Sequence, residues 1–161
     1  MTRKSSFPPV AAASARVLIL GSLPGEQSLA KAQYYGHPQN QFWRLMGEVT
    51  EVDLPSLDYA ARLDSLLADR VALWDVLASA LRSGSLDAAI RAHEANDLRG
   101  LVASLPDLRA VGFNGGTAAR IGRKALTGLD LTLVDLPSSS PAYTLSFDRK
   151  REAWLALRSF L

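Results

Sequence analysis

Short, nearly continuous runs of apolar residues recur along the chain and predict buried strands. The clearest run covers residues 16–21 and ends at Gly21, and similar runs cover residues 71–74, 110–113 and 131–134. Continuous apolar runs of this length are typical of strands that are buried on both faces of a parallel sheet. The stretches between the runs have helical character. This alternation predicts an α/β fold built on a short, mainly parallel, four-stranded sheet.

Between and after these runs, apolar residues are spaced as on one face of a helix. The predicted stripes are Tyr59, Leu63, Leu66 and Leu67, then Leu98, Leu101, Val102 and Leu105, and finally Ala153, Leu157, Phe160 and Leu161. Stripes of this kind pack against a core. Asn96 precedes the second stripe at the position of a helix N-cap. Helices on both faces of the sheet complete a three-layer α/β/α sandwich.

Length and composition are those of one globular domain. The chain has 161 residues, of which 48% are hydrophobic and 21% are charged. It is long enough for a full core but short for two domains. We expect a single domain over residues 1–161, acting as a monomer. Residues 1–15 are rich in Ser and Ala and predict a partly loose lead-in, which Phe7 and Pro8 could pin to the domain.

The residue types present limit the chemistry. Cysteine is absent, which excludes disulfides, Cys-ligated zinc and iron–sulfur clusters. The only histidines, His37 and His93, cannot form a usual multi-ligand metal site by themselves. We therefore expect chemistry without a metal or another cofactor.

Charge and hydropathy also bear on the partners. No apolar run approaches the roughly 20 residues that span a bilayer, and the first residues lack the apolar centre of a signal peptide. A cytoplasmic protein without a membrane partner is expected. The formal net charge of +2 permits binding to nucleic acid without requiring it.

The residues that follow the predicted strands point to one site. In open α/β sheets, ligands bind beyond the carboxyl ends of the strands. The loops that begin at Gly21, Asp75, Asn114 and Leu136 should therefore converge. Asp75 could line this site, although an Asp at that position could equally cap the next helix.

Two segments of the chain have the character of motifs. The first is Gly21-Ser22-Leu23-Pro24-Gly25, followed by Gln33-Tyr34-Tyr35-Gly36-His37-Pro38-Gln39-Asn40-Gln41-Phe42-Trp43. The second is Leu136-Pro137-Ser138-Ser139-Ser140-Pro141-Ala142. Glycine and proline at these points shape tight turns whose main-chain N–H groups a ligand can approach closely.

These segments resemble the uracil-DNA glycosylase superfamily. Residues 37–43 are similar to the HPxNxFW signature of mismatch-specific uracil and thymine DNA glycosylases. Residues 21–25, residues 34–38 and the late motif are more similar to the hypoxanthine-DNA, or DNA-deoxyinosine, glycosylases. The resemblance extends from about Phe7 to the C-terminus. It implies a monofunctional DNA repair enzyme that hydrolyses the N-glycosidic bond of a deaminated base flipped out of DNA and leaves an abasic site.

The departures from the superfamily pattern bear on the substrate. Leu23 stands where several branches carry Asp or Asn, and Leu136 stands where they carry His or Asn. Leucine can neither position water nor polarise a uracil carbonyl. The resemblance to the hypoxanthine branch implies that the catalytic amide is Asn40. Asn40 could also cap the helix that continues through Phe42, and the two roles are compatible.

Several further residues are candidates for holding the base. Main-chain amides from Ser22 to Gly25, a stretch that includes Leu23 and Pro24, could donate hydrogen bonds to it. The side chain of Asn40 or Asp75, or a main-chain carbonyl, could accept one. Tyr34 and Tyr35 could stack on the base or belong to the core. His37 could contact substrate or only orient its loop. Asn114, at the end of the third predicted strand, completes the substrate-binding candidates.

Contacts to DNA are expected from the late motif and the helix after it. Ser138, Ser139 and Ser140 could donate hydrogen bonds to phosphates, or they could form an ordinary polar turn. Arg149 and Lys150 could bind phosphate, although such clusters are commonly solvated surface.

Three other functions compete with hypoxanthine excision. A mismatch-specific uracil or thymine DNA glycosylase is favoured by residues 37–43 and disfavoured by Leu23 and Leu136. A catalytically silent module that binds damaged DNA, and a small-molecule enzyme that only shares the first turn, are the others.

Overall fold

The computed structural model describes residues 3–82, 84–87 and 90–161. Its central sheet has the strand order β3-β2-β6-β7, and all neighbouring strands are parallel. The strands are β2 (Val17–Gly21), β3 (Val71–Asp75), β6 (Ala110–Asn114) and β7 (Thr132–Leu136). The predicted four-stranded sheet is thus confirmed, because each apolar run forms one strand.

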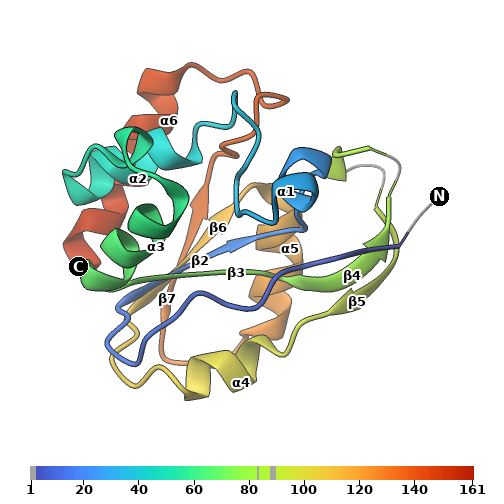
Figure 1. The fold of residues 1–161 in the computed structure, drawn as a ribbon. Coiled ribbons are helices and arrows are strands. Elements are labelled where there is room, and N and C mark those ends of the chain that lie inside the picture. The colour runs from blue at the N-terminus through green and yellow to red at the C-terminus, as the bar shows by residue number, and fades with distance from the viewer. Residues whose placement is uncertain (1–2, 83, 88–89) are drawn as a thin grey trace.

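Helices cover both faces of this sheet, as predicted (Figure 1). One face carries α2 (Phe42–Thr50), α3 (Tyr59–Ala68), α6 (Phe147–Trp154) and the 3₁₀ segments η1 (Leu54–Ser56) and η3 (Leu155–Phe160). The other face carries α4 (Leu98–Ala103) and α5 (Gly116–Ala125). The short helix α1 (Glu26–Lys31) follows β2.

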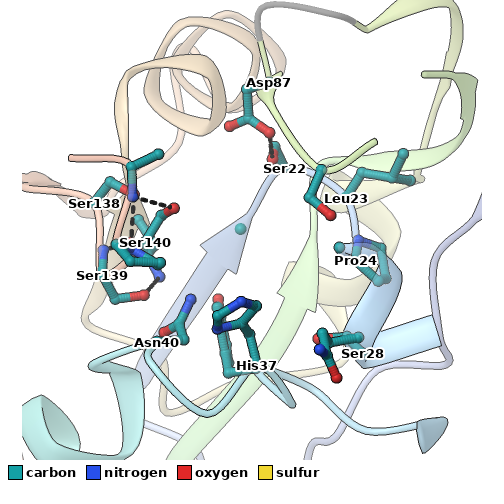
Figure 2. A pocket seen from close by; sticks show the side chains of 18 of the residues that line it. Ser22, Leu23, Pro24, Ser28, His37, Asn40, Asp87, Ser138, Ser139 and Ser140 are labelled. Atoms are coloured by element: carbon teal, nitrogen blue, oxygen red, sulfur yellow. Dashed lines mark hydrogen bonds between the residues drawn. The ribbon is translucent and has the colours of Figure 1, made fainter. Parts of the chain in front are cut away.

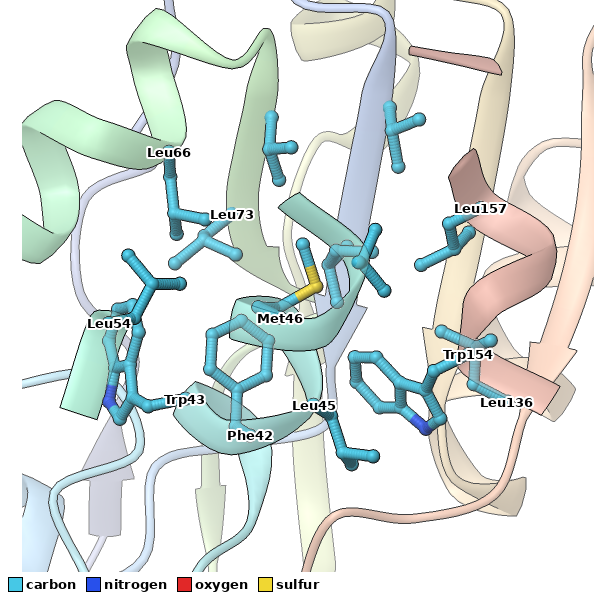
Figure 3. Close-up of a cluster of buried hydrophobic side chains, with 14 of the residues drawn as sticks. Phe42, Trp43, Leu45, Met46, Leu54, Leu66, Leu73, Leu136, Trp154 and Leu157 are labelled. Atoms are coloured by element: carbon cyan, nitrogen blue, oxygen red, sulfur yellow. The ribbon is translucent and has the colours of Figure 1, made fainter. Parts of the chain in front are cut away.

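Alternate residues of the strands supply two separate cores. Val17 and Ile19 face the α2 side, whereas Leu18 and Leu20 face the α4 and α5 side. On the α2 side, the side chains of Phe42, Met46 and Trp154 gather over the sheet (Figure 3). Fully burying such side chains contributes about 1.5–3 kcal/mol each. This layer therefore fixes α2, whose start lies beside the late motif.

A second, antiparallel sheet was not predicted. It consists of β1 (Arg3–Ser5), β4 (Leu77–Leu81) and β5 (Arg91–Ala95) in the order β1-β4-β5. Strand β4 begins directly after Val76, so it extends β3 beyond the parallel sheet. The β4–β5 connection therefore starts close to the carboxyl ends of the parallel strands.

The N-terminal segment is more ordered than its composition suggested. Strand β1 pairs with β4, and Val10 forms a bridge with Leu73. The Phe7 carbonyl accepts a hydrogen bond from Trp74 Nε1 at 3.0 Å, and the Pro8 carbonyl accepts one from Tyr34 Oη at 2.9 Å. The expectation of a partly loose lead-in is therefore wrong for residues 3–15, and the proposed pinning by Phe7 and Pro8 is present.

Asn96 does not cap α4 as expected. The cap is Asp97, whose side chain accepts a hydrogen bond from the Gly100 N–H at 3.0 Å. The Asn96 amide instead donates to the main-chain carbonyls of Asp75 and Leu77, at 2.8 and 3.1 Å. Asn96 thus fixes the junction between β3 and β4. Among the described residues, no helix is long and apolar enough to span a bilayer.

Candidate active site

A cavity of about 460 Å³ lies beyond the carboxyl ends of the parallel strands. Its volume is within the usual range of ligand sites, roughly 300–1,000 Å³. Its lining includes every sequence-predicted catalytic and substrate-binding residue, namely Ser22, Leu23, Pro24, Gly25, Tyr34, Tyr35, His37, Asn40, Asp75 and Asn114, together with Ser138, Ser139 and Ser140. Figure 2 shows that the first-motif loop, the loop before α2 and the late motif face one another across this space.

The loop before α2 holds Asn40 in a defined orientation. The Asn40 N–H donates to the His37 carbonyl at 3.0 Å, and Asn40 Oδ1 accepts a hydrogen bond from the Phe42 N–H at 2.9 Å. With Oδ1 held in this way, the amide nitrogen is directed into the cavity (Figure 2). Asn40 therefore anchors the start of α2 and lines the cavity at the same time.

The position of His37 is compatible with both of the roles considered for it, which are contacting substrate and orienting its own loop. Its Nδ1 accepts a hydrogen bond from the Gln39 N–H at 3.0 Å. This contact shapes the turn and leaves Nε2 as the other ring position for a substrate contact. His37 lines the same cavity.

The two tyrosines differ. Tyr34 is 4% exposed, packs edge-to-face against Phe7 and donates its hydroxyl to the Pro8 carbonyl, so it belongs largely to the core. The Tyr35 ring stacks on Phe42 with centroids 3.9 Å apart. One face of Tyr35 is therefore already covered. Burial raises the pKa of the Tyr35 hydroxyl, so this group is neutral.

The floor of the cavity is formed where β2 and β3 end side by side. Gly21 is paired with Asp75 in the parallel register. A Cβ atom at Gly21 would lie 2.7 Å from Asp75 Oδ1 and 2.9 Å from the Tyr35 hydroxyl oxygen. A side chain at this position would therefore force Asp75 or Tyr35 to move away from the main chain. Asp75 lines the cavity. It does not cap the next helix, α4, because the cap of that helix is Asp97.

The first-motif loop is held by two residues that the sequence had not indicated. Ser22 Oγ donates to Asp87 Oδ1 at 2.7 Å (Figure 2). The Arg82 guanidinium donates to the Pro24 carbonyl and lies 3.7 Å from Asp87. Arg82 is 1% exposed. Both residues come from the unpredicted β4–β5 region, so the only available signal was their position soon after the second strand.

The late motif is tied down by buried hydrogen bonds. Asn114 Nδ2 donates to Ser139 Oγ, and the Ser139 N–H donates to Asn114 Oδ1, both at 2.9 Å. The Gln41 N–H donates to the Ser139 carbonyl at 3.0 Å, which links this motif to the loop that contains Asn40. Trp154 Nε1 donates to the Pro137 carbonyl at 2.9 Å. The Asn114 side chain thus holds the late motif, and the residue also lines the cavity.

Burial changes the assignment of two residues expected to bind DNA. Ser139 is 1% exposed, so its hydroxyl is not available to a phosphate. Lys150 is also 1% exposed, and its Nζ donates to the Ser140 carbonyl at 3.3 Å. Burial lowers the pKa of Lys150. Direct DNA contact by these two side chains does not fit the structure, and both support the late motif instead.

Other polar groups remain at the surface. Arg149 is exposed and forms no ion pair within the described chain, whereas its neighbour Arg151 pairs with Glu48 at 3.1 Å. Ser138 and Ser140 are partly exposed at the edge of the cavity. Among the residues that the structure describes, no cluster of His, Asp and Glu side chains could hold a metal ion.

Comparison with known proteins gives one consistent family. The model of the uracil DNA glycosylase superfamily matches residues 8–158. A hypoxanthine DNA glycosylase of Methanosarcina barkeri (strain Fusaro / DSM 804) is 39% identical over 152 residues, covering 94% of this chain and 96% of the relative. The enzyme of the same name from Methanosarcina acetivorans is 41% identical over 155 residues, covering 96% and 97%. A solution NMR structure from M. acetivorans, provisionally described as a uracil DNA glycosylase, has a TM-score of 0.89 at 38% identity and 99% coverage of both chains.

Proposed function

This chain belongs to the uracil DNA glycosylase superfamily, and we propose that it is a DNA repair glycosylase that releases a deaminated base, with hypoxanthine as the preferred substrate. The observation that carries this proposal is the orientation of Asn40. Its Oδ1 is held by the Phe42 N–H, and its amide nitrogen points into a cavity formed by the superfamily's two motifs. The relatives named hypoxanthine DNA glycosylase support the choice of base.

The proposed reaction is hydrolysis of the bond between C1′ and the base nitrogen. The base leaves with the bonding electrons, a water oxygen adds to C1′, and the water proton is lost to solvent while the base is reprotonated. Because the transition state resembles an oxocarbenium ion, positioning and electrostatics matter more than a strong base. The Asn40 amide nitrogen would hold the water oxygen or the departing base, and the second lone pair of Oδ1 could accept from that water.

Two leucines that depart from the superfamily pattern favour hypoxanthine over uracil as the preferred base. Leu23 is 7% exposed and Leu136 is 4% exposed, so both pack as apolar residues. Neither can supply the polar side chain that several superfamily branches place at these positions. A mismatch-specific uracil or thymine glycosylase remains the second candidate, because residues 37–43 match its signature.

Contacts to the DNA backbone are proposed for the partly exposed Ser138 and Ser140 and for the exposed Arg149. Ser138 Oγ accepts from the Ser140 N–H at 3.1 Å, which leaves its hydroxyl proton free to donate to a phosphate. The proposed activity is assigned to the monomer.

The first experiment is single-turnover base release from matched labelled duplexes that contain hypoxanthine, uracil or no lesion. The proposal predicts fast release of hypoxanthine that Asn40→Ala lowers at least a hundredfold, the size typical of losing one positioned donor, at about 10²–10³. Preferential release of uracil would favour the second candidate. Binding of damaged duplex without release, unchanged in Asn40→Ala, would identify a silent binding module.

A further inference from the structure

The carboxyl group of Asp75 is buried at the floor of the cavity, and one of its two oxygens has no hydrogen-bond partner among the described residues. Asp75 is 4% exposed and lines the cavity. Its Oδ2 has no hydrogen-bond partner, and no ion pair to Asp75 is present within the described chain. Unpartnered buried polar groups are rare because they cost free energy, and they concentrate at sites that bind a ligand.

The groups around Asp75 do not favour its charged form. The nearest cation, Arg82, lies 3.7 Å from Asp87 and donates to the carbonyls of Pro24 and Gly84. Asp87 carries a second carboxyl group on the same wall of the cavity. Arg82 therefore pairs with Asp87 and only partly offsets the repulsion that Asp87 exerts on Asp75.

The remaining side chains that face Asp75 are polar but uncharged. They are the hydroxyl of Tyr35, which approaches Gly21 beside Asp75, and the hydroxyl of Tyr34. Burial, and then repulsion from Asp87 partly opposed by Arg82, raises the pKa of Asp75 to about 7. The local structure thus favours the protonated form of a carboxyl group that would be ionised at neutral pH in water.

We propose that Asp75 recognises the flipped base as a neutral carboxylic acid that donates a hydrogen bond to a carbonyl oxygen of that base. An ionised carboxylate would repel the same oxygen, whereas the neutral acid attracts it. The inference rests on the proposed function and makes it more specific, because it assigns the group that recognises O6 of hypoxanthine. It also makes recognition sensitive to pH, since Asp75 donates only while it is protonated.

A pair of matched substrates tests this contact directly. One duplex carries hypoxanthine, and the other carries unsubstituted purine, which lacks the carbonyl oxygen at position 6 and, with it, the hydrogen on N1. Asp75→Leu is expected to lower release of hypoxanthine about 10- to 100-fold, as for a buried polar group left without its partner, and release of purine less than about threefold. Equal losses on both substrates would overturn the proposal. For each substrate, the rate of the intact protein is divided by the rate of Asp75→Leu. Comparing these two ratios cancels any difference in the intrinsic lability of the two bases.

Asp75→Asn provides the matched control, because its amide keeps a donor at the same place but cannot ionise. In the intact protein, release of hypoxanthine should fall about tenfold per pH unit above pH 7. The Asp75→Asn variant should recover release at pH 8.5 relative to the intact protein and show no such fall. A fall that persists in this variant would belong to another group and would overturn the assignment.

Thermal unfolding and binding to an abasic duplex show whether Asp75→Leu is folded. If it is not, the pH profiles of the intact protein and Asp75→Asn still decide the question. Absence of release from every duplex would overturn the proposed function together with this inference. Release of hypoxanthine by the intact protein that is flat from pH 6 to 9 would overturn only the role of Asp75.

Discussion

Asn40 Oδ1 accepts a hydrogen bond from the Phe42 main-chain N–H at 2.9 Å, at the point where α2 begins. This contact joins the two roles that the sequence left open for Asn40. The oxygen anchors the helix, and the anchored oxygen determines where the amide nitrogen points (Figure 2). This contact, one residue before the N-cap Gln41, is therefore the means by which the loop orients the amide that we propose to be catalytic, since a fixed donor needs no reorganisation during the reaction.

Replacing Asn40 by Asp separates these two roles. Asp retains an oxygen that can accept from the Phe42 N–H. The free energy of unfolding, followed by thermal unfolding, should therefore change by less than about 0.5 kcal/mol. It removes the amide donor, so release of hypoxanthine under single turnover should fall at least a hundredfold, as for loss of a positioned donor of about 10²–10³. Asn40→Ala should lose both functions, with a further stability cost of about 1 kcal/mol. Undiminished release by Asn40→Asp would show that the nitrogen is not required.

Most of the fold could be predicted because the parallel strands are buried on both faces. Residues 17–21 and 110–114 are buried throughout, which requires the continuous apolar runs seen in the sequence. The antiparallel sheet leaves no comparable signal. Strand β5, Arg91–Ala95, is short and includes charged residues, and β4 continues from β3 with only Val76 between them. Arg82 and Asp87, which hold the first-motif loop, were missed because this region was not recognised as a sheet.

The two errors among the expected DNA contacts have a common physical cause. Residue type indicates what a side chain can do, but the direction it faces depends on packing. Lys150, Trp154 and Leu157 are spaced as one stripe of a helix, and all three are buried. That spacing was a signal that Lys150 faces inward. The burial of Ser139 depends on its two hydrogen bonds with Asn114, which comes from another part of the chain and cannot be inferred from spacing.

Asp75 should reduce the stability of the empty protein at neutral and alkaline pH. Its pKa is raised from 3.8 to about 7 in the folded state. Folding therefore favours the protonated form, so the folded state loses stability as the pH rises from the unfolded value through about 7. The substitution Asp75→Asn changes the free energy of unfolding at both pH values. Its effect at pH 8 should be more stabilising than its effect at pH 4 by about 1–3 kcal/mol. Urea unfolding at the two pH values measures this, and an effect independent of pH would contradict it.

Arg149 and its neighbour Lys150 should differ in their effect on DNA binding. Arg149 is exposed, whereas Lys150 is buried beneath the late motif. Each phosphate contact contributes about 0.9 to the slope of log affinity against log salt concentration. Arg149→Ala should reduce this slope by roughly that amount for a duplex with an uncleavable hypoxanthine nucleotide.

Lys150→Met is the matched control for that measurement. It removes the hydrogen bond to the Ser140 carbonyl without removing a surface charge, so the salt slope should remain unchanged while base release slows. A reduced slope in Lys150→Met would mean that this lysine reaches DNA after all.

Tyr143 is expected to help extract the base from the duplex. It is 48% exposed at the edge of the cavity, and Leu86, 59% exposed, lines the same cavity from the β4–β5 connection. The Tyr143 N–H donates to the Ser140 carbonyl at 3.1 Å, so its position is coupled to the late motif. An extruded nucleotide leaves a gap in the base stack, and an aromatic side chain that fills it contributes about 1–3 kcal/mol.

Tyr143→Ala should therefore slow release of hypoxanthine from double-stranded DNA about tenfold, in line with the loss of one stacking contact. The loss on single-stranded DNA of the same sequence should be less than about threefold, because no base pair must be opened there. Tyr143→Phe retains the ring and should behave like the intact protein on both substrates. Equal losses by Tyr143→Ala on both substrates would instead show that Tyr143 shapes the cavity, since only base extraction distinguishes the two forms of DNA.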